Sequence, residues 1–410
     1  MTVRKVALFS KEYPPNVYGG AGVHVEYLAR ALSRLLPVEV RCFGDQASEA
    51  PNLTVRGYAG WDEMARNTDP RFVPMLDAFA RSLAIAKDRL DADLVHAHTW
   101  YTDMAGLLAA RLWGVPYVLT VHSLEPLRPW KVEQLGNGYH LSAWMERTAL
   151  EQADAVIAVS AETRADILRL FAIAPERVHI IHNGIDPDEY CAKAAIRPDF
   201  ARLGIDPTRP YVLFVGRITR QKGIIHLVRA CADITRDMQI VLCAGAPDTP
   251  GIAEEMQREV AQARTGRDDI VWIADMLPRA ETIGLYAHAA IFCCPSVYEP
   301  FGIINLEAMA CEVPVVASAV GGIPEVVVPG ETGLLVNPGL VPGSFDPADP
   351  ALFARHLAAA INRLAADPAL CRRMGLAGRR RVETRFSWQA IAERTLDLYR
   401  SLGAARAGAA

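Results

Sequence analysis

The sequence has almost no excess of charge and no long apolar run. Its 410 residues include 43 lysines and arginines against 47 acidic residues, which gives a formal net charge of −4. A chain this close to neutrality lacks the broad basic surface that binds nucleic acid, and it lacks the apolar stretch that crosses a bilayer. We therefore expect neither nucleic acid nor a membrane span, while a local site for a small anion fits this composition.

The sequence also lacks the paired motifs of metal and disulfide sites. Its eight cysteines form no C-x-x-C pair, most of them lie in apolar stretches such as "IFCCP" (residues 291–295), and no H-x-x-x-H pattern suggests a metal. The first residues, "MTVRKVALFSKEYPP", have no apolar core of a signal peptide. We interpret the cysteines as buried thiols, and we expect a cytoplasmic protein without a metal or another cofactor.

What the chain does have is a regular alternation of short β-branched runs and longer helical patterns. This alternation indicates βαβ units and parallel sheets. The expected strands span residues 5–10, 38–43, 93–98, 116–122, 155–160 and 178–184 in the first half, and 211–217, 240–245, 270–275, 291–296, 314–319 and 333–337 in the second. The predicted fold class is therefore α/β, with two Rossmann-like, doubly wound parallel-sheet domains that face a central cleft, where ligands of such sheets bind.

A polar, proline-rich stretch separates the two series of strands. It covers residues 184–209, after which "YVLFVGR" opens the second series. We predict a first domain over 1–187, a second over 188–386, and a C-terminal helix over 387–410 that could pack back on the first domain.

A glycine-rich turn follows the first predicted strand. In "NVYGGAGVHVEYLARAL", Gly19, Gly20 and Gly22 precede a long helix, so that backbone without side chains could approach a phosphate at the helix N-terminus. Val25 stands where a dinucleotide-binding fingerprint has its third glycine, which makes a dinucleotide oxidoreductase a weak hypothesis. Plain turn geometry explains the glycines equally well.

Charged residues follow two strands of the second half. "FVGRITRQKG" places Arg217 and Lys222 just past the first strand, where they could lie over a phosphate or belong to a solvated loop. "EPFGIINLE" places Glu299 in a loop and Glu307 in the first turn of a helix that begins near Ile304. The N–H groups of Gly302 to Asn305 would point at an anion, while the two acids would accept hydrogen bonds from two sugars. Simple helix capping by Glu307 is the alternative.

Two histidines end strands of the first half, His98 in "LVHAHTW" and His122 in "LTVHS". A histidine at the carboxyl end of a parallel strand faces the ligand crevice, although structural histidines are commoner than catalytic ones.

Taken together, "GGAG", "VGRITRQKG", "EPFGIINLE" and "RFSW" resemble, in this order, the retaining glycosyltransferases of family 4 with the GT-B fold. The stretches "KEYPPNVYGGAGVHVEYLARAL", "HAHTWYTDMAG" and "TVHSLEPLRPWKVEQLGNGYHLSAWMERTA" resemble more narrowly the short, actinobacterial type of glycogen synthase. Classical bacterial glycogen synthases carry a Lys-x-Gly-Gly element where this chain has "VYGG", so that Lys11 could take the place of that lysine.

The resemblance implies transfer of glucose from ADP-glucose with retention, into an α-1,4 bond, without a metal. It implies that Arg217 and Lys222 hold the diphosphate and that Glu299 and His122 contact the donor glucose. The implied donor-binding residues are Gly19, Gly20, Gly22, Gly302, Ile303, Ile304, Asn305 and Glu307, with Glu307 on the ribose hydroxyls. No side chain is an evident nucleophile, so the family's front-face proposal applies, in which the departing diphosphate takes the proton of the acceptor hydroxyl.

The acceptor is predicted from the loop "HSLEPLRPWKVEQLGNGYH", in which Arg128 and Lys131 flank Trp130. Two fixed cations suit glucose 1-phosphate and α-maltose 1-phosphate as product, whereas two ordinary exposed cations would leave glucan ends as the main acceptor. The expected partners are ADP-glucose, glucose 1-phosphate and α-1,4-glucan, with a homodimer as an option. A nucleotide-sugar 2-epimerase and a non-catalytic glucan-binding protein are the alternatives from other classes.

Overall fold

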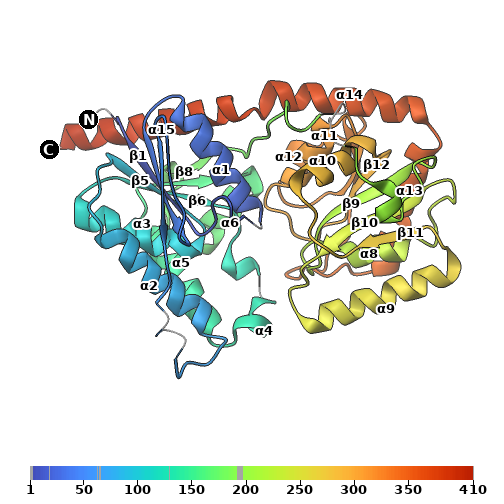
Figure 1. Ribbon diagram of the computed structural model, residues 1–410, viewed down its shortest axis with the longest axis horizontal. Coiled ribbons are helices and arrows are strands. Elements are labelled where there is room, and N and C mark those ends of the chain that lie inside the picture. The colour runs from blue at the N-terminus through green and yellow to red at the C-terminus, as the bar shows by residue number, and fades with distance from the viewer. Residues whose placement is uncertain are drawn as a thin grey trace. The chain divides into compact units, whose positions relative to one another are not determined.

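The computed structural model describes residues 3–17, 19–61, 63, 66–128, 130–191 and 197–409. The chain folds into two compact units. Unit 1 comprises residues 1–184 and 388–410, and unit 2 comprises residues 185–387 (Figure 1). Among the described residues, no helix has both the length and the apolar character needed to cross a bilayer.

Unit 1 is built on an eight-stranded sheet in the order β3-β4-β2-β1-β5-β6-β7-β8. All neighbouring strands are parallel except β3 and β4. The strands are β1 (Val6–Ser10), β2 (Val38–Phe43), β3 (Ala47–Ala50), β4 (Leu53–Tyr58), β5 (Leu94–His98), β6 (Tyr117–Val121), β7 (Ala155–Ala158) and β8 (Val178–Ile180). Every residue of β1, β5, β6 and β7 is buried, as expected for parallel strands covered on both faces.

Helices cover both faces of this sheet because successive strand residues point to opposite sides. Phe9 and Leu119 share one core with residues of α2 and α3, whereas Leu8 and Val118 share the other with residues of α1 and α15. The helices of unit 1 are α1 (Gly20–Ser33), α2 (Val73–Lys87), α3 (Trp100–Trp113), α4 (Lys131–Leu135), α5 (Gly138–Gln152), α6 (Ala161–Leu170) and α15 (Trp388–Ala409), with short 3-10 turns η2 (Glu125–Leu127) and η3 (Pro175–Arg177).

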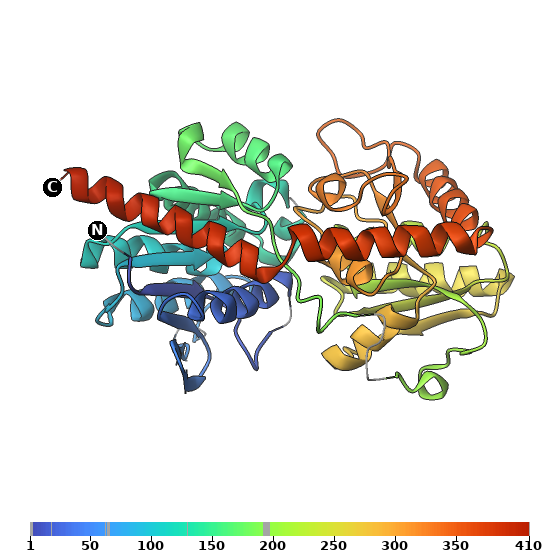
Figure 2. The same cartoon turned by 90° about the horizontal axis from the view of Figure 1, so that it is seen from above.

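The chain returns to unit 1 through α15, which lies lengthwise along that unit in Figure 2. Trp388 stacks on Tyr27 of α1, with ring centroids 5.7 Å apart. The hydroxyl of Tyr399 lies 2.6 Å from Nδ1 of His96 in β5, so the last helix closes one face of the first sheet.

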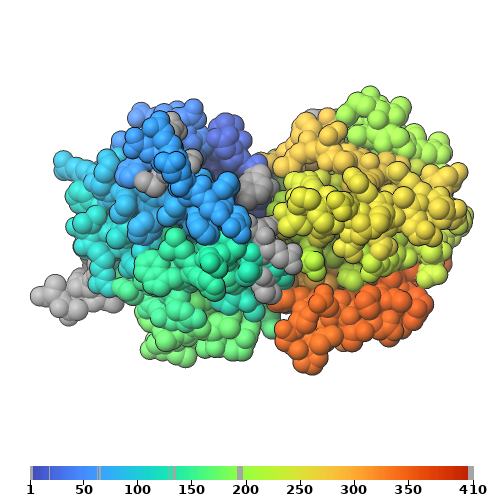
Figure 3. All heavy atoms as spheres, turned by 90° about the horizontal axis from the view of Figure 1, so that it is seen from below, coloured from blue at the N-terminus to red at the C-terminus, as the bar shows by residue number. Residues whose placement is uncertain are grey.

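Unit 2 is built on a six-stranded parallel sheet in the order β11-β10-β9-β12-β13-β14. Its strands are β9 (Tyr211–Arg217), β10 (Gln239–Gly245), β11 (Ile270–Ile273), β12 (Ile291–Cys294), β13 (Val315–Ser318) and β14 (Gly333–Val336). Its helices are α7 (Phe200–Leu203), α8 (Ile224–Ala230), α9 (Pro250–Gly266), α10 (Arg279–His288), α11 (Ile303–Ala310), α12 (Ile323–Val326), α13 (Pro350–Ala365) and α14 (Pro368–Arg385). Helix α9, in yellow, lies at the surface of unit 2 in Figure 3.

Each sheet has one point at which the strand order reverses. In unit 1 the chain moves outward from β1 through β2 and returns to the other side of β1 with β5. In unit 2 it moves outward from β9 through β10 and returns beside β9 with β12. Ligands of open α/β sheets bind beyond the strand ends at such a switch point, so the loops after β1, β5, β9 and β12 are the places to look for a site.

Candidate active site

The loops after β9 and β12 bring together a lysine, a glutamate and a serine. Nζ of Lys222 lies 2.7 Å from Oε2 of Glu299, and the hydroxyl of Ser296 donates to the same oxygen at 3.1 Å. We name these residues the unit 2 triad. Oε1 of Glu299 accepts no hydrogen bond from any residue that the structure describes. One carboxylate oxygen is therefore available to a hydroxyl of a ligand.

Glycines let these two loops approach each other. A Cβ on Gly223 would stand 2.1 Å from the carbonyl oxygen of Pro295, and the N–H of Val297 donates to Gln221 at 3.0 Å. A Cβ on Gly321 would stand 1.9 Å from the carbonyl oxygen of Glu299. Because Gly223 and Gly321 also have positive φ angles of 60° and 54°, larger residues would displace the backbone that carries the triad.

The triad keeps Lys222 charged. Burial lowers the pKa of Lys222, but the negative charge of Glu299 and their hydrogen bond more than offset it, so the pKa lies above its usual value. A lysine that is charged and still partly exposed, at 20% of its side chain, can attract a phosphate.

Arg217 stands at the end of β9 and forms an ion pair across the sheet edge. Its Nη1 lies 2.8 Å from Oδ1 of Asp248, and 32% of its side chain is exposed. A guanidinium presents five N–H donors in a planar fork, a geometry that suits phosphate oxygens.

Glu307 lies in α11, one residue beyond the first turn in which the sequence placed it. The hydroxyl of Tyr190 donates to Oε1 of Glu307 at 3.2 Å. Burial raises the pKa of Glu307, against the opposing effects of Tyr286, Tyr190, Arg279 and Lys222.

The residues before Glu307 only partly match the predicted ring of N–H donors. Gly302 has φ of 96° and is the N-cap of α11, and Ile303 and Ile304 are half-buried. The N–H of Asn305 already donates to the carbonyl of Gly302 at 3.0 Å, which corrects the expectation that it points at an anion. The buried side chain of Asn305 has no hydrogen-bond partner among the described residues.

In unit 1, the glycine-rich turn is occupied by a carboxylate of the chain itself. The N–H of Gly19 donates to Oε2 of Glu12 at 2.9 Å, and a Cβ on Gly22 would stand 2.6 Å from the same oxygen. Gly20 begins α1. The glycines therefore make room for Glu12 beside the start of α1, and Lys11 next to it stacks over the ring of Tyr101 at 3.9 Å.

The histidines at the ends of β5 and β6 belong to a larger cluster. Nδ1 of His98 lies 3.2 Å from Nε2 of His122, and both rings pack against His24 of α1. Burial and the neighbouring histidines hold the pKa values of His98 and His122 well below the usual range, so both rings are neutral at pH 7. Because Nε2 of His98 is buried without a partner among the described residues, we assign its proton to Nδ1, which donates to His122. His122 then carries its own proton on Nδ1.

One nitrogen from each of His24, His98 and His122 lies within 4.8 Å of the others. Neutral imidazoles are ligands of transition metals, and among the described residues this group has the donors for such an ion. His98 and His122 share a hydrogen bond, whereas both ring nitrogens of His24 are buried without a hydrogen-bond partner among the described residues.

Arg128 and Lys131 follow β6, but neither is an ordinary exposed cation. Lys131 is 6% exposed, with Nζ 2.7 Å from Oε1 of Glu125, and Nη1 of Arg128 lies 3.7 Å from the same oxygen. Burial lowers the pKa of Lys131, Glu125 restores part of it, and Arg128 lowers it further, so the net shift is downward. Trp130 precedes α4.

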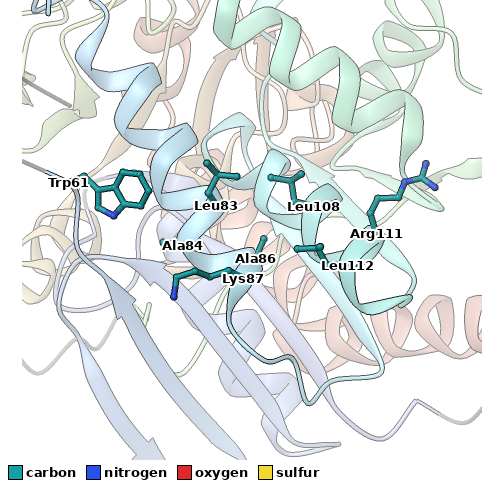
Figure 4. Close-up of a pocket in the computed structure, with 8 residues that line it drawn as sticks. All are labelled: Trp61, Leu83, Ala84, Ala86, Lys87, Leu108, Arg111 and Leu112. Carbon is teal, nitrogen blue, oxygen red and sulfur yellow. The ribbon is translucent and has the colours of Figure 1, made fainter. Parts of the chain in front are cut away.

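Two hollows in unit 1 differ in chemistry. One, of about 430 Å³, lies beside the end of β1 and is lined in part by Lys11, Glu12, Asp77 and Arg81. The other, of about 420 Å³, lies between α2 and α3 and is lined by Trp61, Leu83, Ala84, Ala86, Lys87, Leu108, Arg111 and Leu112 (Figure 4). The wall of the second is almost wholly apolar, and beyond Trp61, Lys87 and Arg111 none of the described residues that line it has a polar side chain that could orient a sugar or a phosphate.

The chain is similar to known glycosyltransferases along nearly its whole length. Residues 18–189 match Glycosyltransferase Family 4, and residues 196–381 match Glycosyl transferases group 1. Alpha-maltose-1-phosphate synthase of Mycolicibacterium smegmatis is 50% identical over 408 residues, which cover 98% of this chain and 100% of that protein. The protein of the same name from Mycobacterium tuberculosis is 48% identical over 404 residues, which cover 97% and 99%.

Among solved structures, sucrose-phosphate synthase from Thermosynechococcus elongatus superposes with a TM-score of 0.77 at 28% identity, covering 98% of this chain and 100% of that one. The two-sheet architecture is thus the GT-B fold, as the resemblance implied. An epimerase and a non-catalytic binding protein are set aside, because the chain is a glycosyltransferase that belongs to glycosyltransferase family 4.

Proposed function

We propose that the protein transfers glucose from ADP-glucose to glucose 1-phosphate, with retention, and so forms α-maltose 1-phosphate. Similarity at 50% identity to an alpha-maltose-1-phosphate synthase, over 98% of this chain and 100% of that protein, is the observation that carries this proposal. The unit 2 triad supports the donor side, and the cations of the loop after β6 support a phosphorylated acceptor.

We assign the donor to unit 2. Lys222 and Arg217 bind the diphosphate and stabilise the charge that develops as ADP leaves. Oε1 of Glu299 accepts a hydrogen bond from a glucose hydroxyl, since its other oxygen is already held by Lys222 and Ser296. Glu307, fixed by Tyr190, accepts from the ribose. ADP is preferred to UDP on the family resemblance of the motifs alone, because we assign no residue to a base pocket.

The chemical step breaks the bond between C1 of glucose and the diphosphate oxygen. A bond from C1 to the 4-hydroxyl oxygen of the acceptor forms on the same face, and the proton of that hydroxyl passes to the departing diphosphate. His122, neutral and protonated on Nδ1, offers an N–H to a sugar hydroxyl and does not compete for this proton.

We assign the phosphate of the acceptor to Arg128 and Lys131. A glucan end has no charge to offer them, so the same loop should discriminate between the two acceptors. Slower extension of α-1,4-glucan remains part of the proposal, and an enzyme that acts mainly on glucan ends is the second candidate.

The test supplies ADP-glucose with glucose 1-phosphate or with glycogen at matched concentrations of acceptor ends. We expect ADP release and a new phosphorylated disaccharide, seen by ³¹P NMR, to be faster with glucose 1-phosphate. Much faster reaction with glycogen would overturn the acceptor assignment and leave the donor assignment standing. An exchange of ADP-glucose for UDP-glucose in the same assay tests the nucleotide.

We also propose a reducing compartment, the cytoplasm, and allow for a homodimer. Each of the eight cysteines is a free thiol, which supports the first.

A further inference from the structure

The loop after β6 has a buried acid at its centre. Glu125 begins η2, is 1% exposed, and stands six residues before Lys131. Its Oε1 accepts from Nζ of Lys131 at 2.7 Å and lies 3.7 Å from Nη1 of Arg128. Its Oε2 accepts from the hydroxyl of Ser142 at 3.1 Å. Both carboxylate oxygens are therefore in use.

The backbone of Glu125 is fixed as well. Its N–H donates to Oε2 of Glu146 at 3.0 Å, and its carbonyl accepts from the hydroxyl of Tyr139 at 2.6 Å. Ser142, Tyr139 and Glu146 all belong to α5, so one helix holds the main chain and the side chain of Glu125. The loop that carries the two cations is thereby tied to the body of unit 1.

Two cations share one oxygen of Glu125, since Lys131 and Arg128 both lie within 4 Å of its Oε1. Burial raises the pKa values of the nearby Asp103 and Glu146 well above the usual range, and Glu125 raises both further, which favours the neutral forms of these two acids. Nε of Arg128 is buried with no hydrogen-bond partner among the described residues, so the guanidinium has a donor left for an anion.

A contribution to stability alone does not explain the buried ion pair of Glu125 and Lys131. Buried ion pairs are often no more stable than well-packed apolar residues of the same volume, because desolvation cancels the attraction. Glu125 is also a poor ligand for a phosphate, since its own charge would repel one. Its contacts suit a residue that acts through its neighbours.

We propose that Glu125 is a positioning residue that holds Lys131 and Arg128 in place for the phosphate of the acceptor, and so sets the preference for phosphorylated over neutral acceptors. This inference rests on the proposed function. Without the Glu125 charge, Lys131 is free to turn away. Part of the binding free energy of a phosphate is then spent on ordering the lysine side chain, so the affinity falls.

Glu125→Gln tests this, because it preserves shape and removes charge. We measure kcat and KM with glucose 1-phosphate, with a maltooligosaccharide acceptor, and with ADP-glucose as the varied substrate, together with the melting temperature. The expected result is a rise in KM for glucose 1-phosphate of about 10-fold or more, by analogy with the loss of a residue that orients a metal-binding side chain. KM for the maltooligosaccharide and for ADP-glucose, and kcat at saturation, should stay within about twofold of the parent. Glu162→Gln, an exposed acid of α6, is the control and should change nothing.

A purely structural role predicts equal losses with both acceptors, and that outcome overturns the inference. Lys131→Met separates the two hypotheses. If Lys131→Met raises KM for glucose 1-phosphate and Glu125→Gln does not, the positioning role is wrong and the acceptor assignment stands. If neither variant changes that KM, the assignment of the acceptor phosphate to this loop fails, and the inference falls with it.

Discussion

Each unit contains a lysine, a glutamate and a serine with nearly the same geometry. In unit 1, Glu125 accepts from Lys131 at 2.7 Å and from Ser142 at 3.1 Å. In unit 2, Glu299 accepts from Lys222 at 2.7 Å and from Ser296 at 3.1 Å. We call the first group the unit 1 triad. The two groups differ in which oxygens are used and in how deeply the lysine is buried.

These differences indicate different tasks. In the unit 1 triad the donors occupy both oxygens of Glu125, whereas in the unit 2 triad they share one oxygen of Glu299. The side chain of Lys131 is 7% exposed and that of Lys222 is 20% exposed. A glutamate with an oxygen to spare can contact a substrate directly, while a fully engaged one can act only through its partners.

The largest expected effect comes from substitutions in the unit 2 triad. Lys222→Ala and Glu299→Ala should each lower kcat by about 100-fold or more, the usual effect of losing a group that stabilises developing charge. Steady-state rates with saturating ADP-glucose and glucose 1-phosphate measure this, with circular dichroism as the check on folding. Near-parent rates in either variant would contradict the donor assignment. Lys87→Ala, an exposed lysine of α2, is the control.

The second prediction compares how much each lysine–glutamate pair contributes to the stability of the protein. Lys131→Met leaves Glu125 charged and buried without its closest partner, which typically costs about 3–5 kcal/mol. Lys222→Met should cost less, because the side chain of Glu299 is 8% exposed and that of Glu125 only 1%. Urea denaturation of both variants, monitored by a signal of each unit, checks the order. An equal or larger loss in Lys222→Met would show that burial does not distinguish the two pairs.

A smaller effect is expected in the pH dependence. A lysine is charged below its pKa, and the pKa of Lys131 is lowered by burial and Arg128 against Glu125 and Glu146, whereas that of Lys222 is raised. As the pH rises toward the ordinary lysine value of about 10.4, Lys131 should lose its charge first. The phosphate itself does not titrate there, since its second pKa is about 6.

KM for glucose 1-phosphate should therefore rise at a lower pH than KM for ADP-glucose. The measurement is a pair of alkaline pH profiles on the parent protein. In Glu125→Gln the rise should begin at a still lower pH, because the charge that supports the lysine proton is gone. A profile in which donor binding fails first would contradict the assignment of Lys131.

The sequence predicted most of the fold because buried parallel strands are continuous apolar runs. All twelve expected strands overlap an observed one, for example β9 at Tyr211–Arg217. Strands β3 and β4 were missed. Every residue of "ASEA" in β3 is exposed, and β4 pairs with it at the sheet edge, so neither has the apolar run that marks a buried strand.

The site was predicted less evenly. Lys222 and Glu299 could be found because both follow strands and local position suffices. Glu125 could not be found in this way. An acid in a proline-containing loop is expected to be exposed, and its burial here depends on packing against α5. Tyr190 lies 117 residues before Glu307, and Glu12 fills the turn that the glycines suggested for a phosphate. Ser296 could have been predicted as a site residue, because in "CCPS" it follows the end of a strand.

The two serines give the smallest and most selective test. Ser142→Ala removes the hydrogen bond to Oε2 of Glu125, which leaves a buried oxygen unsatisfied and should cost about 1–3 kcal/mol. Ser296→Ala removes a bond to an oxygen that Lys222 still holds, and should cost about 1 kcal/mol or less. The hydroxyl of Ser142 has a second acceptor, the carbonyl of Tyr139 at 3.0 Å. Because one hydroxyl donates to one acceptor at a time, we expect the cost of Ser142→Ala at the lower end of its range. Melting curves of the two variants, recorded side by side, measure the difference. Equal shifts in melting temperature would mean that Glu299 depends on its serine as much as Glu125 does. The distinction between a glutamate that contacts the substrate and one that positions its neighbours would then lose its structural basis.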